Sequence, residues 1–508
     1  MFKGQPKGLF ALALANTGER FGYYTMIAVF ALFLRANFGL EPGTAGTIYS
    51  TFLALVYFLP LVGGILADKF GYGKMVTIGI LIMFFGYLLL SIPLGSGTVA
   101  LVAMMAALLL VSFGTGLFKG NLQVMVGDLY NDPKYAAKRD SGFSLFYMAI
   151  NIGALFAPTA AIKIKEWAEV SLGFDGNAAY HFSFAVACAS LVLSIAIYYA
   201  FRSWFKHVEG GSAKEKEQVV DTLTPEQTKS RMVALFMVFG VVIFFWMAFH
   251  QNGLSLTYFA DEFTAQSSTG VQSMAFNVWN LVAIIAIVYA LFSVFDKEAT
   301  KKGKWIGVGV VALACAFLCW QYTRLAGPVA VSAPIFQQFN PFYVVALTPV
   351  SMAIFGALAA KGKEPSAPRK IAYGMLVAAV AYALMLFFSI GLPMPQTVMV
   401  DGQPVAQHVA DVTPNLLIGT YLILTFGELL LSPMGISFVS KVAPPKYKGM
   451  MMGGWFVSTA IGNFLVQVGG LLWGKTPLWV VWGVFMGLCL ISAAVMFAMM
   501  KKLEAATK

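Results

Sequence analysis

Long apolar segments alternate with short polar ones along almost the whole chain. Runs of about 20 or more apolar residues, long enough to cross a bilayer as a helix, recur throughout the sequence. This pattern predicts an all-α polytopic membrane protein with 14 spans. We expect these spans near residues 9–35, 45–68, 74–94, 98–127, 142–163, 178–201, 231–260, 271–295, 304–325, 340–360, 370–391, 414–440, 450–474 and 477–501.

A polar, charged segment at residues 202–230 separates the first six spans from the last eight. It is rich in helix-forming residues and is expected to be a solvated cytoplasmic tether. The chain is therefore predicted to consist of an N-terminal six-helix bundle over residues 1–201, the linker, and a C-terminal part over residues 231–508. A division into two comparable halves is typical of transporters built from repeats.

Composition supports a membrane protein, because 59% of the residues are hydrophobic and only 11% are charged. Soluble proteins carry about a quarter charged residues. The net charge of +11 does not require a nucleic-acid partner. If the N-terminus lies in the cytoplasm, most of the 34 Lys and Arg residues fall on the cytoplasmic side, as the positive-inside rule predicts. We therefore expect a multi-pass protein of the cell (inner) membrane with both termini cytoplasmic.

Cysteine usage suggests neither a disulfide framework nor a metal site. The four cysteines all lie within apolar segments, where they are expected to be packing residues: Cys188, Cys315, Cys319 and Cys489. Cys315 and Cys319 are one helical turn apart, but no His or Cys cluster accompanies them. We expect no metal and no cofactor.

A few ionisable residues lie deep within the predicted spans: Glu19, Arg20, Lys119, His250 and Glu428. Such residues are functional candidates, because lipid does not solvate them. Glu19 and Arg20 share one helical face with Asn16, Tyr23, Tyr24 and Ile27. That face is expected to line a bundle interior or an aqueous cavity. The alternative is a structural ion pair that holds two helices together.

The other deep residues occupy distinctive surroundings. Lys119 follows Gly114 and Gly116 and precedes Gly120, which allow another backbone or a ligand to approach. Its expected partner is Glu19 or a ligand carboxylate. Glu428 precedes Pro433 and Gly435, which can break the helix. His250 is either a hydrogen-bonded packing residue or a group that titrates near neutral pH.

Several motifs together resemble the proton-dependent oligopeptide transporters, a branch of the major facilitator superfamily. The segments are ERFGYY, GGILADKFGYGK, GTGLFKGNLQVMVGDLY, FYMAINIGAL, FNPFYVVALTPV and GELLLSPMGISFVSKVAPPKYKGMMMGGWFVS. The resemblance covers both halves of the chain. It implies the major facilitator fold, with two six-helix bundles around a central cavity and two accessory helices. We expect the accessory pair at about residues 271–325, as a peripheral hairpin with no site residues.

The resemblance also assigns substrate-binding roles. Arg20 and Lys119 look like the pair that holds a peptide's C-terminal carboxylate, and Glu428, Asn151 and Asn340 like the group that takes its amino terminus. A fork-shaped guanidinium and a point-charge ammonium both suit a carboxylate. The other positions that match the family's pocket are Tyr23, Tyr24, Tyr57, Trp246, Trp455 and Ser458.

Three positions depart from the family pattern. Asn16 stands where the family has a second acid, Ile27 where it has a base, and His250 where it has an acid. The base and the acid often pair in the family, so their joint loss leaves no charge stranded. These changes affect proton coupling more than recognition. The residues left as possible proton carriers are Glu19, Glu428 and His250.

The implied function is a symporter that imports di- and tripeptides with protons by alternating access. Its expected partners are small peptides, protons and the lipid bilayer, and the protein is expected to be a monomer. Three alternatives stay open: a carrier for another small anion or zwitterion such as nitrate or a modified amino acid, a carrier with weak or absent proton coupling, and a peptide receptor that transports nothing. An enzyme is not expected, because no Ser–His, paired Asp or His–Glu arrangement lies at membrane depth.

Overall fold

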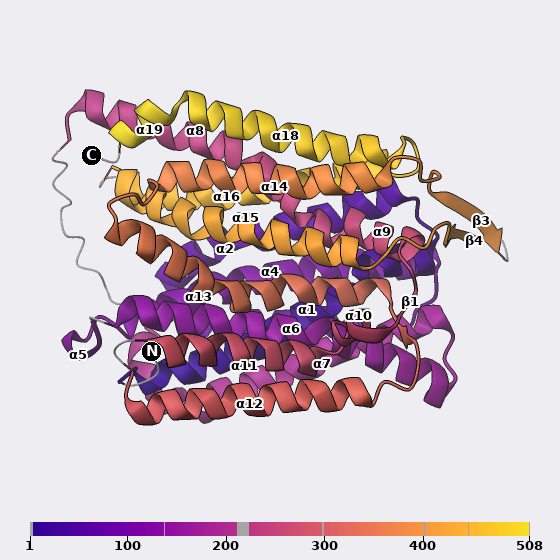
Figure 1. Cartoon of the computed structure of the whole chain (residues 1–508). Helices are drawn as coiled ribbons and strands as arrows, with labels where there is room; N and C mark the ends of the chain where they lie inside the picture. Colours follow the sequence, from indigo (N-terminus) through magenta and orange to yellow (C-terminus); the bar gives the residue numbers. More distant parts are fainter. Residues whose placement is uncertain are drawn as a thin grey trace.

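The computed structural model describes residues 4–136, 138–210, 223–296, 299–400, 403–444 and 447–506. Fourteen helices of the described residues are long and apolar enough to cross a membrane, which confirms the predicted number of spans. Both termini lie at the same end of the helices (Figure 1). We call this end the terminal side and the opposite end the far side.

The first half of the chain supplies six long helices: α1 Lys7–Phe38, α2 Pro42–Phe70, α3 Tyr72–Leu90, α4 Thr98–Asp128, α6 Arg139–Leu172 and α7 Gly176–Ala200. They pack mainly on one another, with α1 against α6 and α7, and α4 against α2 and α3. The short elements of this half are α5 Pro133–Ala136, η1 Arg202–Trp204 and η2 Lys206–Val208.

The second half supplies the remaining helices: α8 Pro225–Phe249, α9 Ser255–Phe263, α11 Val278–Phe295, α12 Lys301–Thr323, α13 Phe339–Ala360, α14 Ala367–Ser389, α15 Asn415–Val442, α16 Lys448–Leu465, α17 Gln467–Leu472 and α18 Leu478–Ala498. Its short elements are η3 His250–Gly253, α10 Gly270–Met274, η4 Ala333–Gln338 and α19 Met500–Ala505, with the strands β1 Ser267–Ser268, β2 Val329–Ala330, β3 Gln396–Val400 and β4 Gln403–Gln407.

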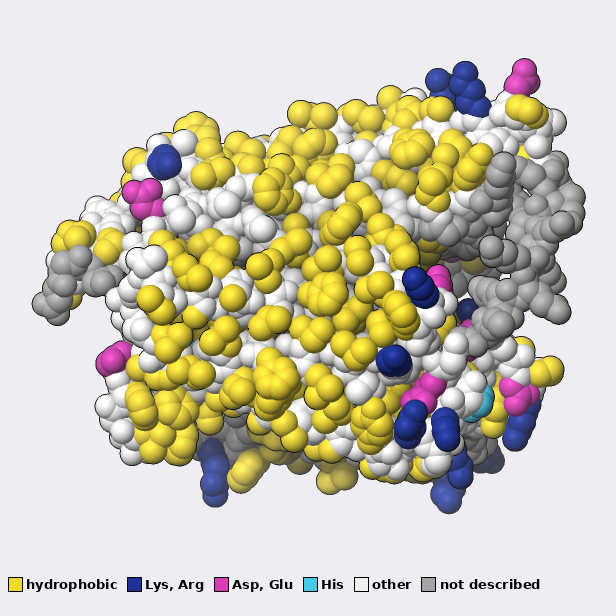
Figure 2. Space-filling model, turned by 180° about the vertical axis from the view of Figure 1, so that it is seen from behind, with side chains coloured by type: hydrophobic (Ala, Val, Ile, Leu, Met, Phe, Trp, Pro, Cys, Tyr) yellow, Lys and Arg dark blue, Asp and Glu magenta, His cyan; other side chains and the backbone are white. Residues whose placement is uncertain are grey.

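Two elements stand apart from the two bundles. The accessory helices α11 and α12 pack on each other at the edge of the molecule, and α11 also contacts α6 and α13. The antiparallel hairpin of β3 and β4 projects from the far side (Figure 1). On the face seen in Figure 2, hydrophobic side chains cover most of the surface between the two ends, and charged side chains gather toward those ends. This arrangement fits a protein embedded in lipid.

Glycines allow the helices of the first half to approach closely. A Cβ atom added to Gly63 would lie 2.1 Å from the carbonyl oxygen of Gly116, and one added to Gly114 would lie 2.6 Å from that of Gly79. These contacts confirm the packing role expected of Gly114 and Gly116. Gly120 differs, because an added Cβ would meet Pro60 only at an ordinary 3.7 Å.

Some predicted boundaries are wrong. The span expected at 142–163 runs from Arg139 to Leu172, and the pairs Lys163–Glu166 and Lys165–Glu169 stabilise its extension. α8 begins at Pro225, inside the expected linker, because Thr224 and Gln227 form a capping box. Residues 211–222 of the linker lie outside the described residues.

The second half differs from the expectation in detail. The span expected at 231–260 is a single span from Pro225 to Phe263, with a short 3₁₀ turn at His250–Gly253 within it. The helix α15 continues through Pro433, and Gly435 leaves room for the Trp455 ring. Cys188 and Cys489 are buried as expected, but Cys315 and Cys319 are exposed on α12, of which few residues are buried. These two cysteines are therefore not packing residues.

Candidate functional site

Glu19 and Arg20 neutralise each other on α1. The Arg20 guanidinium donates two hydrogen bonds to the Glu19 carboxylate, from Nε at 2.5 Å and from an Nη atom at 2.6 Å. Both side chains are buried, and the guanidinium also lies 4.7 Å from the centre of the Tyr23 ring. A buried, bidentate pair explains how two full charges are accommodated at this depth. The pair lies within one helix, so it does not hold two helices together.

The ammonium group of Lys119 forms no ion pair with an acidic residue among the described residues. Its ammonium lies 4.1 Å from the centre of the Tyr57 ring, a cation–π contact between α4 and α2. The close packing of Gly116 on Gly63, with the hydrogen bond from Asn121 Nδ2 to the Gly63 carbonyl, fixes this pairing of helices. The expectation that Glu19 binds Lys119 is wrong, because Glu19 pairs with Arg20.

Glu428 lies on α15, in the second bundle. Its carboxylate accepts a 2.9 Å hydrogen bond from Asn340 Nδ2, which also donates to Thr425 Oγ1 at 3.1 Å. Among the described residues, no Lys or Arg forms an ion pair with Glu428. The structure thus brings two of the predicted residues, Asn340 and Glu428, into direct contact.

Tyrosines connect the two groups of charges. Tyr24 lies close enough to interact electrostatically with both Arg20 and Glu428, and Tyr57 does the same. Tyr147 of α6 is 46% exposed, although it interacts with Glu428, Tyr24 and Tyr57. These tyrosine side chains link Arg20 in the first bundle electrostatically to Glu428 in the second.

The remaining predicted residues make local contacts within and between helices. Trp246 stacks on His250 with 5.4 Å between ring centres, and His250 lies 5.9 Å from Tyr57. Trp455 packs against Gly435 of α15. Two side chains are held by their own helices, because Asn151 donates to the Tyr147 carbonyl and Ser458 to the Gly454 carbonyl.

Sequence reasoning missed two residues of this region, Tyr147 and Thr425. Tyr147 precedes Asn151 by four residues and so shares its helical face, which was a usable signal. Thr425 precedes Glu428 by three residues. Its hydroxyl could not be assigned to the Glu428 group without knowing where Asn340 lies.

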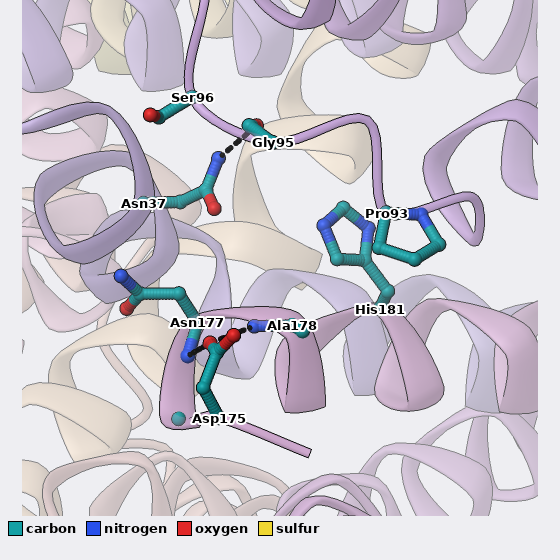
Figure 3. Close-up of a pocket in the computed structure, with 9 residues that line it drawn as sticks. Asn37, Pro93, Gly95, Ser96, Asp175, Asn177, Ala178 and His181 are labelled. Atoms are coloured by element: carbon teal, nitrogen blue, oxygen red, sulfur yellow. Dashed lines mark hydrogen bonds between the residues drawn. The ribbon is translucent and has the colours of Figure 1, made fainter.

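A separate surface pocket of about 420 Å³ lies on the far side, between the ends of α1 and α7 and the segment that joins α3 to α4 (Figure 3). Asn37 donates to the Gly95 carbonyl, and Asp175 caps α7 by accepting from Asn177 and Ala178. His181 Nδ1 lies 2.6 Å from the Leu90 carbonyl oxygen. These polar groups serve local structure, and the pocket contains none of the predicted site residues.

Comparison with known proteins identifies the family. The model of the POT family matches residues 73–226 and 321–470. The chain belongs to the POT family. Its match therefore includes Lys119 and Asn151 in the first bundle and Asn340 and Glu428 in the second.

Curated relatives of this POT family member align over nearly its full length. It is 29% identical to the uncharacterized transporter YclF of Bacillus subtilis, over 92% of this chain and 89% of the relative. It is 27% identical to the peptide transporter YePEPT of Yersinia enterocolitica, over 91% of this chain and 87% of the relative.

Solved structures confirm the fold. A POT family transporter in complex with 5-aminolevulinic acid superposes with a TM-score of 0.73 at 20% identity. The superposition covers 100% of this chain and 98% of the other. The major facilitator architecture of two six-helix bundles with two additional helices, predicted from the sequence, is therefore confirmed.

Proposed function

We propose that this POT family member is a secondary active symporter that imports di- and tripeptides with protons by alternating access. The observation that carries the proposal is the arrangement of two uncompensated charges. Lys119 and Glu428 belong to different bundles, and tyrosines that interact with each other lie between them. A zwitterionic peptide presents a carboxylate and an ammonium group that match these two charges.

Each predicted residue then has a specific role. Lys119, with Arg20 once it is released from Glu19, binds the C-terminal carboxylate. Glu428 binds the peptide ammonium, with Asn340 and Asn151 beside it. The residues that would contact the peptide backbone or its side chains are Tyr23, Tyr24, Tyr57, Trp246, Trp455 and Ser458. The relative named as a peptide transporter supports this choice of substrate.

Proton coupling is assigned to Glu19, Glu428 and His250. Protonation of Glu19 would weaken its bond to Arg20 and free the guanidinium for the substrate. Glu428 differs, since its partners are the neutral side chain of Asn340 and, when present, the substrate. The alternating bundles in this scheme are residues 1–201 and 231–508, joined by the linker at 202–230.

A second candidate is a carrier for another small zwitterion. The structural neighbour in complex with 5-aminolevulinic acid favours it, because that ligand also carries an amino and a carboxyl group. The two uncompensated charges would suit either class of substrate. A receptor that binds peptide without moving it remains the alternative outside transport.

Uptake into proteoliposomes tests these proposals. Labelled dipeptide is supplied with and without an inward proton gradient, and we expect the gradient to raise the rate. Equal rates would remove proton coupling. Competition for uptake between Ala-Ala and a panel of amino acids and nitrate identifies the substrate class. A protein that binds peptide but shows no counterflow would be a receptor.

Orientation can be measured in the same preparation. We propose an inner-membrane protein with the terminal side in the cytoplasm, because basic residues gather there. A cysteine at Lys501 should react with impermeant maleimide only from the cytoplasmic side. Reaction from outside would reverse the proposed orientation. The monomeric state stays a prediction, which light scattering in detergent can check.

A further inference from the structure

The far-side pocket of Figure 3 keeps acceptor atoms that its own structure does not use. Asn37 donates through Nδ2 to the Gly95 carbonyl, so its Oδ1 has no partner among the described residues. In Figure 3 this oxygen points away from Gly95 and toward α7. Asn37 is only 6% exposed, and the pocket is the space open to it. The Asp175 carboxylate accepts both capping hydrogen bonds through Oδ1, which leaves Oδ2 available.

His181 supplies a third acceptor from within α7. Its Nδ1 lies 2.6 Å from the Leu90 carbonyl oxygen, and because a carbonyl can only accept, Nδ1 carries the hydrogen. In the neutral ring Nε2 is then an acceptor, and it has no partner in the part of the chain that the structure describes. The rings of Phe33 and Phe184 hold the imidazole, with 5.3 and 5.9 Å between ring centres. His181 is 7% exposed, lines the pocket and interacts electrostatically with Asp175.

The charge of the pocket favours a cation. None of the nine residues that line it is Lys or Arg, and Asp175 carries a negative charge. A Cβ atom added to Gly176 would lie 3.2 Å from the carboxylate of Glu169, whose charge is balanced by Lys165. No three His, Cys, Asp or Glu side chains of the described residues meet as metal ligands would. A primary ammonium group, which donates three hydrogen bonds and accepts none, matches three unpaired acceptors.

An apolar crevice continues from this pocket along the far ends of α3 and α4. It shares Gly95 and His181 with the pocket, and its apolar walls include Leu89 of α3 and Met104 of α4. Met104 lies six residues into α4, or about 9 Å from the far end of that helix at 1.5 Å per residue. Leu94, at the crevice, is 45% exposed. The whole site therefore suits a ligand with an ammonium head and an apolar tail.

We propose that this site binds an aminophospholipid, phosphatidylethanolamine, from the leaflet on the far side. Asn37, Asp175 and His181 hold its ammonium group, and one acyl chain follows the crevice toward the membrane centre. Its phosphate faces Ser96 and Asn177, two exposed side chains of the pocket that can donate hydrogen bonds. The bound lipid joins α1, α7 and the segment between α3 and α4. The site does not depend on what the protein transports.

Native mass spectrometry of the purified full-length protein tests the site. Phosphatidylethanolamine is compared with phosphatidylcholine of the same acyl chains, because the trimethylated headgroup keeps the charge but has no N–H donor. We expect the parent protein to retain about tenfold more phosphatidylethanolamine, the effect of one charge-assisted hydrogen bond. Equal retention of the two lipids would overturn the proposal.

Variants of the acceptors place the lipid. Asp175→Asn removes the charge but keeps a side-chain oxygen that can cap α7, and Asn37→Leu removes the free oxygen. Both variants should lose most of the preference for phosphatidylethanolamine, and Asp175→Asn decides the matter if Asn37→Leu does not fold. Asp132→Asn is the matched control, because Asp132 also accepts from a backbone amide but lies on the terminal side. A preference that survives in Asp175→Asn would overturn the placement.

Two further measurements separate this site from other binding. Phosphatidylethanolamine with a photoreactive diazirine near the start of one acyl chain should label residues 89–104, and label confined to other segments would overturn the site. Glycerophosphoethanolamine, the same headgroup without acyl chains, should leave the bound lipid in place even in large excess. Displacement of the lipid would show a site for soluble amines and would overturn the role of the crevice.

Discussion

The ammonium nitrogen of Lys119 lies 4.1 Å from the centre of the Tyr57 ring and meets no carboxylate among the described residues. We expect Lys119→Ala to lower dipeptide uptake by about 10- to 150-fold, because a charge-assisted contact to the substrate is worth roughly 1.5–3 kcal/mol. The rate of labelled dipeptide uptake into proteoliposomes measures this loss. Lys501→Ala is the control, since Lys501 is exposed on the terminal side; equal losses in both variants would contradict the site.

Glu428 should recognise the peptide ammonium. In the parent protein, acetylating the amino terminus of Ala-Ala should weaken competition by about tenfold, the effect of roughly 1.4 kcal/mol. In Glu428→Gln this difference should nearly vanish, because the charge is gone while an amide can still accept from Asn340. Glu364→Gln, whose carboxylate lies on the surface, should keep the parent's preference. An unchanged preference in Glu428→Gln would place the ammonium elsewhere.

Glu19 should stabilise the fold through Arg20. Glu19→Gln leaves the buried guanidinium without its counter-ion, and breaking such a pair costs about 3–5 kcal/mol. We expect a clear fall in melting temperature of the purified protein. The matched change Glu166→Gln breaks a pair whose side chains are 72% and 56% exposed and should leave the melting temperature almost unchanged. Similar melting temperatures for both variants would show that Arg20 finds another partner.

His408 should make the far-side strap, residues 408–412, sensitive to pH. Burial opposes its protonation, but hydrogen bonds to the Asp261 carbonyl and the Asp411 carboxylate outweigh it and raise the pKa of His408 above 6.5. The charged imidazole can donate at both positions. The added stability is therefore complete below pH 6.5 and is lost as pH rises through the higher pKa of the folded protein.

Hydrogen exchange can follow this effect. Val409 and Val412 donate their amides to the carbonyls of Glu262 and Phe263, so these amides report on the strap. After correction for intrinsic rates, we expect their protection to fall as pH rises above about 6.5. His408→Ala should abolish this change. A pH dependence that survives in the variant would assign the effect to another group.

The number of spans could be predicted because only a long apolar run can cross a bilayer. Helix ends were harder to predict, because the 3₁₀ turn at His250–Gly253 involves hydrogen bonds to distant segments, from Gln251 to the Val466 carbonyl and from Tyr421 to the Asn252 carbonyl. Within the site, the shared face of α1 was predictable from helical periodicity. The partner of Arg20 was not, because periodicity does not specify which rotamers meet.

Contacts between distant segments could not be predicted from the sequence alone. Arg35 and Glu262 form a buried ion pair, yet they are 227 residues apart in the sequence. Both lie near helix ends, where charged residues are common and do not by themselves indicate a buried ion pair. Asn340 and Glu428 came from family resemblance, and the structure adds their direct hydrogen bond. Residues whose significance depends on a neighbour from another helix thus need the fold first.

Because Glu19 and Arg20 cancel, the charges left in the site are one cation and one anion. A dipolar peptide bound between them adds no net charge to the moving protein. The charge of any proton transported with the peptide is then not compensated by another moving charge. Membrane voltage therefore contributes about 2.3 kcal/mol per 100 mV for each such proton. Transport would in that case generate a measurable inward current, even when the pH is equal on both sides.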